Sequence, residues 1–219
     1  MTRLLRRLRS QGGYSLIEML IVLSIMTVVM GALSTLFVQA SNSETDMNNR
    51  FQAQQTARLA LDKLRREVHC ASTATPNNPG GPSWSVTLTL ASYCKTLPQP
   101  LPTPLPSYCS TSGGLTTCSI TWCTRNVATN RNALYRVTGS TCGASGGVKW
   151  ADYLVPTNTA PASPTCTGGA LCVFNYSAPT SAVLGKLQVE VPVNVKPSKS
   201  VELYDLSDGL VLRNSARTS

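Results

Sequence analysis

The chain has 219 residues, of which 42% are hydrophobic and only 13% are charged. It is therefore too apolar for a disordered protein and too poor in charge for a highly helical cytosolic one. The formal net charge is +9, and eight Cys accompany a single His. One His disfavours a His-built metal site and limits acid–base chemistry, whereas an even, high number of Cys suits an oxidising compartment.

Basic residues are concentrated at the N-terminus. Four Arg lie in the first 13 residues without any acidic residue, and removing this segment lowers the net charge to +5. Residues 19–38 then carry no charge, and as a helix they would span about 30 Å, the thickness of a bilayer core. Because the Arg cluster precedes this run and Glu44 and Asp46 follow it, the positive-inside rule predicts one transmembrane helix with its N-terminus in the cytoplasm.

Two general interpretations of this segment are open. A secretory signal peptide would be cleaved after the apolar run, and residues 38–40 (Val-Gln-Ala) fit such a site, although the run is long for a signal sequence. A plain transmembrane anchor explains the length and the orientation but not Glu18. A carboxylate at the edge of an apolar segment costs free energy when it is buried, so Glu18 needs a partner or must reach the membrane surface.

A third interpretation rests on a short motif ahead of the apolar run, and it accounts for the Arg cluster, Glu18 and the apolar run together. Residues 12–18 read Gly-Gly-Tyr-Ser-Leu-Ile-Glu. This sequence resembles the type IV prepilin signature, with Gly at the last leader position and Glu at the fifth mature position. The resemblance implies that a prepilin peptidase cleaves between Gly13 and Tyr14 and N-methylates Tyr14, where the family usually has Phe. It also implies that Glu18 serves filament assembly by pairing with the new amine of a neighbouring subunit, which would offset the cost of burying the carboxylate.

Residues 39–75 predict an extension of the same helix. No Gly or Pro interrupts this range, and Pro76 with the Pro- and Gly-rich residues after it ends the helix. The block is similar to the region after the anchor in larger minor pilins and pseudopilins. The solvent side is expected to carry two i,i+4 ion pairs, Asp62–Arg66 and Lys63–Glu67. The apolar face is expected to consist of Met47, Phe51, Ala57, Leu61, Leu64 and Val68.

The remaining residues, 76–219, predict a β-rich domain. Residues 84–90 and 187–195 alternate apolar and polar side chains, and clusters of Gly, Ser, Thr, Asn and Pro separate the candidate strands. Pro192 suggests an edge position or a bulge in its strand. Shorter candidates are 118–124, 133–138, 171–176, 201–206 and 210–213. The expected fold class is α+β: a long N-terminal transmembrane α-helix packed on a disulfide-rich, mainly antiparallel β domain, as in type IV pilins.

All eight Cys lie outside the membrane on this topology, and four disulfides are the natural count. Cys118 and Cys123 face opposite sides of one predicted strand, so they should bridge to different partners. Cys70 could tether the end of the helix to the β domain. Zinc is disfavoured because only Cys118 and Cys123 have a suitable spacing. The disulfide candidates are Cys70, Cys94, Cys109, Cys118, Cys123, Cys142, Cys166 and Cys172, and the last two could close a small loop.

Catalytic signals are weak. Residues 143–147 match the pattern G-x-S-x-G, but the only His, His69, precedes Ser145, and the acidic residues fit neither the chymotrypsin nor the hydrolase order. A flexible Gly/Ser turn is the favoured interpretation. We therefore expect no enzyme, no cofactor and no metal. The +5 charge of the mature chain could assist contact with nucleic acid, but its basic residues are scattered and give this no support.

The resemblance leads to a functional hypothesis. The chain is expected to be a structural subunit, a minor pilin or a type II secretion pseudopilin, of a type IV pilus-like filament. The expected partners are prepilin peptidase, other pilin or pseudopilin subunits, the inner-membrane assembly machinery, and membrane lipid before assembly. The expected location is the cytoplasmic membrane, in a single pass with the N-terminus in the cytoplasm, and then the filament with the C-terminal domain outside. The alternative is a membrane-anchored extracellular binding or adhesive protein that is not built into a filament.

The same hypothesis divides the chain into four segments. They are a cleaved basic leader (1–13), a transmembrane or filament-core helix (14–38), the extension of that helix (39–75) and an extracytoplasmic β-rich domain (76–219).

Overall fold

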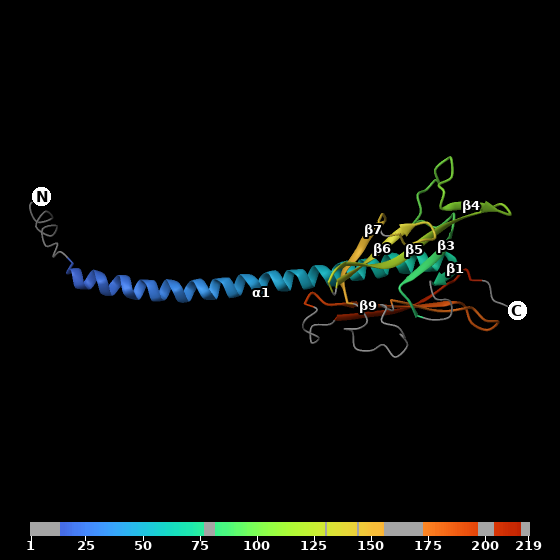
Figure 1. The fold of residues 1–219 in the computed structure, drawn as a ribbon. Helices are drawn as coiled ribbons and strands as arrows, with labels where there is room; N and C mark the ends of the chain where they lie inside the picture. Colours follow the sequence, from blue (N-terminus) through green and yellow to red (C-terminus); the bar gives the residue numbers. More distant parts are fainter. Residues whose placement is uncertain are drawn as a thin grey trace, which may run out of the picture. The chain divides into compact units, whose positions relative to one another are not determined.

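The computed structural model describes residues 14–76, 82–129, 131–143, 145–155, 173–196 and 204–215. The chain divides into two compact units, and the boundary in the sequence lies between Asn48 and Asn49. One helix, α1 (Leu16–Cys70), begins in the first unit and ends in the second, and the described strands follow it in the second unit (Figure 1). The predicted α+β class is therefore confirmed.

The strands form one antiparallel sheet. Its order is β1-β3-β5-β6-β7-β9-β8-β2, with β10 paired to β9 and β4 paired to β5. The strand bounds are β1 (Ala71–Pro76), β2 (Pro82–Ser83), β3 (Ser85–Ala91), β4 (Cys109–Ser112), β5 (Leu115–Ala128), β6 (Arg131–Thr138), β7 (Val148–Leu154), β8 (Phe174–Ser177), β9 (Lys186–Val193) and β10 (Tyr204–Val211).

Most of the predicted strands are present with shifted ends. The two long alternating segments correspond to β3 and β9, and residues 118–124 and 133–138 lie within β5 and β6. The described part of the candidate 171–176 corresponds to β8, and the candidates near the C-terminus merge into one strand, β10. Strands β1, β2, β4 and β7 were not predicted. The missed strands β1 and β4 are rich in Ser and Thr, so they lack the apolar alternation that marks a strand.

The helix ends at Cys70, so residues 71–75 do not extend it as we expected. They form β1, in which Ala71 and Ala74 are buried and Thr75 pairs with Thr87 of β3. Thr is a poor helix former and a good strand former, and the ladder with β3 gives this segment backbone partners that a fraying helix end would lack.

The inward face of α1 differs from the predicted one. Met47 and Phe51 are 69% and 64% exposed, whereas Ala53 and Ala60, which were not on the predicted face, are buried. The buried positions recur three or four residues apart, as one helix face requires. They are Ala53, Ala57, Ala60, Leu61, Leu64, Glu67 and Val68.

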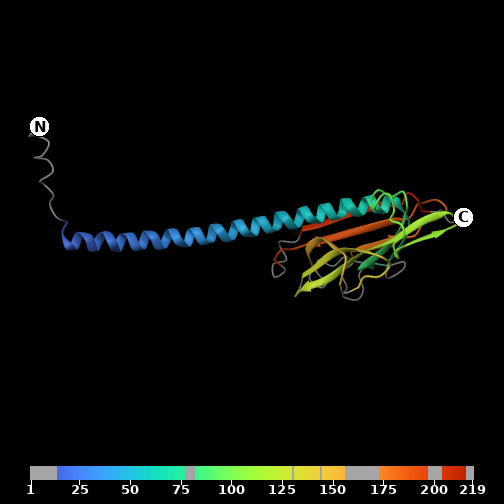
Figure 2. The same cartoon turned by 90° about the horizontal axis from the view of Figure 1, so that it is seen from above.

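These helix residues form one core with both halves of the sheet. Leu88 of β3 and Ile120 of β5 join it from one half, and Val189 of β9 and Leu210 of β10 join it from the other. In Figure 1, β5, β6 and β7 are seen on one side of the last part of α1 and β9 on the other. Seen from above, the same part of the helix runs beside the pair β9–β10 (Figure 2). Arg65 of the helix contacts Asp208 of β10 at 2.7 Å.

Pro192 lies neither on an edge strand nor at a bulge, contrary to the prediction. Strand β9 has β10 along one side in an unbroken register and β7 and β8 along the other. The backbone nitrogens of Glu190 and Asn194 donate to Val173 and Tyr153 on the second side. The backbone nitrogen of Pro192 lies between these two nitrogens and points to the same side. The pairing of β9 with β8 ends at Val189, and its pairing with β7 starts at Val193. No ladder hydrogen bond is therefore lost because Pro192 has no N–H.

Three disulfides link described residues. They are Cys70–Cys94, Cys109–Cys118 and Cys123–Cys142. The end of α1 is thus tied to the segment after β3, and Cys118 and Cys123 have different partners, in agreement with their opposite faces in β5. Cys166 and Cys172 lie outside the described residues.

A polar cluster links the first residue of β6 to the last residues of β7. Arg131 of β6 donates two hydrogen bonds, of 2.8 and 2.7 Å, to the carboxylate of Asp152 in β7, and Lys149 donates a third. Burial alone would raise the pKa of Asp152, but the hydrogen bonds from Arg131, Lys149 and the Tyr153 N–H outweigh it and hold the pKa well below its usual range. Tyr153 itself has a φ of 62°, an uncommon left-handed conformation for a side chain of this size.

Candidate functional site

The N-terminal part of α1 is apolar and fully exposed. Every residue from Tyr14 to Thr45 is exposed in the structure. Among the described residues, α1 is the one helix long and apolar enough to cross a membrane, with a mean hydropathy of 2.4 over its most apolar stretch and none of that stretch buried. An apolar helix this long with no covering side chains is suited to an environment other than water.

The hydroxyl groups within this stretch are satisfied by the helix itself. In lipid an unpaired hydroxyl donor would cost free energy, and a bond to the backbone one turn earlier removes that cost. Each of four hydroxyls donates at 2.8 Å to a carbonyl three or four residues before it. The pairs are Ser24 to Ile21, Thr27 to Ser24, Ser34 to Met30 and Thr35 to Ala32. The stretch from Met19 to Val38 therefore offers no unpaired hydroxyl donor to its surroundings.

Glu18 is the one acidic residue in the first turn of α1. Its side chain is exposed and makes no hydrogen bond or ion pair with another residue of the described part of the chain. The helix N-terminus, with its unpaired N–H groups, favours a carboxylate there. Tyr14 lies just before the helix and is also exposed, whereas Gly13 and the residues before it are outside the described residues. Glu18 is thus an exposed carboxylate at the start of an apolar segment, without a partner among the described residues.

One known family motif matches this segment of the chain. The prokaryotic N-terminal methylation motif matches residues 8–34, which include Gly13, Tyr14, Glu18 and most of the apolar stretch. The chain is therefore type IV prepilin-like, a family resemblance that its N-terminal residues had already indicated. No curated protein and no solved structure matches the chain at a significant level.

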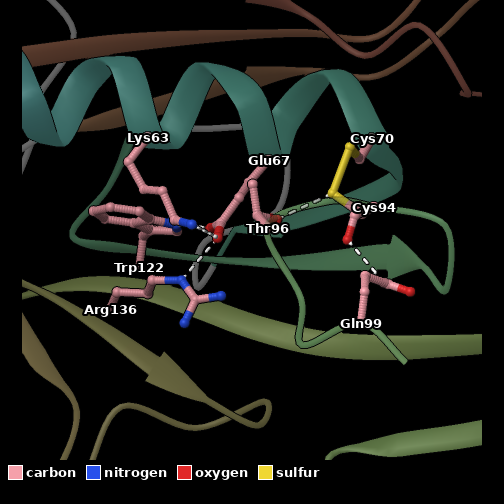
Figure 3. A network of polar contacts seen from close by, with 8 residues as sticks. All are labelled: Lys63, Glu67, Cys70, Cys94, Thr96, Gln99, Trp122 and Arg136. Atoms are coloured by element: carbon pink, nitrogen blue, oxygen red, sulfur yellow. Dashed lines mark hydrogen bonds and ion pairs between the residues drawn. A yellow bond between two sulfur atoms is a disulfide. The ribbon is translucent and has the colours of Figure 1, made fainter. Parts of the chain in front are cut away.

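A second polar site is buried beneath the end of α1 (Figure 3). Glu67 is fully buried, and its carboxylate accepts hydrogen bonds from Trp122 Nε1 at 2.7 Å and from Arg136 Nε at 2.8 Å. Lys63 lies 3.9 Å from the same carboxylate. Glu67 therefore joins the helix to β5 and β6, and the prediction that it forms a solvent-side pair with Lys63 is wrong in its placement. The other predicted pair, Asp62–Arg66, lies on the exposed face at 2.6 Å.

Aromatic and cationic groups surround this carboxylate. Trp150 of β7 lies 6.1 Å from Trp122 between ring centroids, and the Lys63 ammonium lies 6.0 Å from the Trp150 ring. Burial lowers the pKa of Lys63, the Glu67 carboxylate raises it, and the Arg136 charge lowers it further. Both oxygens of the Glu67 carboxylate are engaged and join the helix to the sheet, whereas the Trp150 Nε1–H is buried without a hydrogen-bond partner.

The two residues named by the weak catalytic signals, Ser145 and His69, belong to different parts of the fold. Ser145 is exposed, and its carbonyl accepts a 3.5 Å hydrogen bond from Arg125. His69 lies at the end of α1, where burial lowers its pKa and the charges of Arg213 and Arg65 lower it further. Within the described residues, no group of three or more His, Cys, Asp and Glu side chains could hold a metal ion.

Proposed function

We propose that the chain is a structural subunit of a type IV pilus-like filament, as a minor pilin or a pseudopilin. The observation that carries this proposal is the methylation motif at residues 8–34, in which Glu18 occupies the first turn of an exposed apolar helix. Signal-peptide cleavage after Ala40 would fall within α1, whereas cleavage before Tyr14 would leave the whole helix in the mature chain.

The proposed processing removes the leader and keeps the helix. A prepilin peptidase would cut between Gly13 and Tyr14 on the cytoplasmic side and methylate the Tyr14 amine. Gly13 suits this site because a residue without a Cβ lets the backbone enter a tight protease cleft. Tyr14 would then begin the mature chain, two residues ahead of α1.

In the proposed assembly, the exposed apolar segment from Tyr14 to Val38 lies first in the cytoplasmic membrane and then among the same segments of other subunits. Lipid and neighbouring helices are both apolar, so the transfer costs little hydrophobic free energy. The Glu18 carboxylate would pair with the cationic Tyr14 amine of a neighbour, which supplies a partner that the described residues of its own chain do not give it.

The test is the intact mass of the membrane protein isolated from cells that contain prepilin peptidase. We expect a chain that lacks residues 1–13 and carries one additional methyl group. Gly13→Asp should block this processing, whereas Gly12→Asp, with the same charge one residue further from the cleaved bond, should block it less. Cleavage after Ala40, or no cleavage of the unaltered chain, contradicts the proposal.

The alternative function, a membrane-anchored binding protein whose N-terminal motif is coincidental and which is not built into a filament, does not require this processing. The two functions also differ in where the chain is found. Shearing cells and sedimenting the filaments separates the two. Recovery of the processed chain with filaments supports the structural role, and its complete retention in the membrane supports the alternative.

A further inference from the structure

A long gap in charge falls within the β domain. Residues 96–124, between Lys95 and Arg125, contain no Asp, Glu, Lys, Arg or His. This charge-free segment includes the Pro-rich loop 97–106, β4 and most of β5 (Figure 1). Surfaces of soluble domains are normally rich in charge. The exposed part of this segment, which includes Ser107 and most of β4, offers only uncharged side chains, and this favours contact with an uncharged partner.

The Pro-rich loop within this segment is flanked by disulfides on both sides. Cys94 before the Pro-rich loop is bonded to Cys70, and Cys109 after it is bonded to Cys118. The Gln99 amide donates to the carbonyls of Ser92 and Cys94, as its contact with Cys94 in Figure 3 shows. A loop that is ordered before it meets a ligand loses less conformational entropy on binding.

A hollow lies where two strands share one edge of β5. The Ser119 N–H donates to the Tyr108 carbonyl, next to β4, and the Ser119 carbonyl accepts from the Gly139 N–H, just after β6, both at 2.8 Å. Strands β4 and β6 thus follow one another along the same side of β5, with Ser119 at the junction. Gly139 has a φ of 110°, which a residue with a side chain rarely adopts, and the chain leaves β5 there.

The hollow has a volume of about 190 Å³ and is lined by hydroxyl groups. Its lining includes Ser107, Tyr108, Ser110, Ser119, Gly139 and Ser140. None of the five side-chain hydroxyls makes a hydrogen bond to another residue in the described ranges, although the backbone groups of Ser119 and Ser140 are paired. Unlike the Glu67 carboxylate, this site has hydrogen-bonding capacity that the fold itself does not use.

The chemistry of the lining selects the class of ligand. An ionic ligand would lose hydration here without gaining an opposite charge, and a purely apolar ligand would cover the hydroxyls without pairing them. A neutral ligand with many hydroxyl groups satisfies both conditions, and the half-buried ring of Tyr108 offers an apolar face beside them. We propose that this hollow binds a neutral carbohydrate.

The size of the hollow limits what it holds. It is smaller than the roughly 300–1,000 Å³ of pockets for drug-sized ligands, so it accommodates a single sugar unit of a longer chain. Binding through one unit is weak, and we expect a dissociation constant of about 1 mM, equivalent to about −4 kcal/mol. Many copies of the site on one cell or filament would raise the overall avidity.

The test uses the full-length protein in a detergent without a sugar headgroup. Saturation-transfer NMR is recorded with a panel of neutral disaccharides that includes lactose, maltose and cellobiose, and with sialylated lactose as the charged counterpart. We expect at least one neutral disaccharide to bind and the sialylated form not to bind better. Absence of binding across the panel, or a preference for the sialylated form, overturns the proposal.

Substitutions on β4 locate the site. Ser110→Leu fills the hollow from its lining, and Ser112→Leu introduces the same side chain two residues further along the strand, at an exposed position outside the lining. We expect Ser110→Leu to weaken binding at least tenfold and Ser112→Leu to leave it unchanged. Ser140→Leu approaches the hollow from the other segment and should match Ser110→Leu, which guards against a local folding defect in β4. Equal effects of Ser110→Leu and Ser112→Leu would place binding elsewhere and overturn the assignment.

Discussion

Arg136 Nε donates a 2.8 Å hydrogen bond to Glu67 Oε1, although 69 residues separate the two in sequence. The other carboxylate oxygen accepts from Trp122 Nε1 at 2.7 Å. Glu67 is fully buried and the Arg136 side chain is only 15% exposed. A single carboxylate therefore fixes the end of α1 against two neighbouring strands, and both of its oxygens are engaged.

Removal of this carboxylate should destabilise the β domain. Glu67→Ala leaves the Arg136 guanidinium and the Trp122 N–H buried without their acceptor, which typically costs about 3–5 kcal/mol. Glu67→Gln keeps the shape and one acceptor oxygen and should cost less. Denaturant unfolding of the full chain in detergent, followed by Trp fluorescence, measures both, because Trp122 lies at the site.

Asp62→Ala is the matched control for Glu67→Ala. It removes a carboxylate from the same helix, but the Asp62–Arg66 pair is exposed and such pairs contribute about 0–1 kcal/mol. A loss of stability in Glu67→Ala no larger than that in Asp62→Ala would show that the buried pair does not hold the helix.

From the sequence, Glu67 and Asp62 could be assigned to ion pairs only by their spacing from Lys63 and Arg66. Spacing alone does not distinguish a buried pair from an exposed one. Lys63 and Glu67 are four residues apart, as are Asp62 and Arg66, so both pairs resemble solvent-side pairs. The partners that draw Glu67 inward, Trp122 and Arg136, come from strands far along the chain. Tertiary contacts of this kind carry no local signal.

The same reasoning explains why other features were predicted well or poorly. The motif at residues 12–18 is local, so its recognition needs no tertiary structure. The helix face was assigned from large apolar residues, but Met47 and Phe51 lie outside the stripe that small Ala53 and Ala60 complete. Alternation within one strand separated the partners of Cys118 and Cys123, whereas the identity of those partners depends on how loops return to the sheet.

The titration of His69 should be shifted downward. Burial is the largest cause, and the positive charges of Arg213 and Arg65 also disfavour the protonated imidazole. We expect a pKa below the usual value of about 6.5, and Arg213→Gln should raise it while leaving it below that value. The chain has one His, so NMR of the untagged protein observes a single imidazole. An unchanged pKa in Arg213→Gln contradicts the role of that charge, and Arg66→Gln is the control for a general loss of positive charge.

Asp152 should make the free energy of unfolding depend on pH in the acidic range. Its pKa in the folded chain lies below the unfolded value of about 3.9, so the unfolded state binds the proton more readily. The stabilisation is therefore present above about pH 4 and is lost as the pH falls toward the folded pKa. Asp152→Asn should lower the free energy of unfolding at pH 7, and its difference from the unaltered chain should shrink at pH 3. A difference that stays constant or grows at pH 3, in urea unfolding at both values, contradicts this assignment.

The Cys70–Cys94 disulfide should contribute more stability than Cys109–Cys118. It spans 24 residues of sequence, whereas the second spans nine, and a longer loop restricts the unfolded chain more. Replacing both Cys of the first pair by Ala should cost about 2–4 kcal/mol, and replacing the second pair should cost about 1 kcal/mol less. Peptide mapping without reduction verifies the pairs, and denaturant unfolding measures the two costs. The reverse order of costs would show that native contacts, rather than loop length, dominate.

Glu18 provides the test that separates the proposed processing from the proposed assembly. Glu18→Ala leaves the residues on either side of the Gly13–Tyr14 bond intact, so intact mass should still show removal of the leader. The variant lacks the carboxylate that would pair with the Tyr14 amine of a neighbour, so its share of sheared filaments should fall at least tenfold, equivalent to about 1.4 kcal/mol per subunit. Glu44→Ala removes a carboxylate beyond the apolar stretch and should assemble normally. Normal incorporation of Glu18→Ala would refute the pairing while leaving the processing proposal intact, and an equal loss in Glu44→Ala would show that the effect is one of net charge.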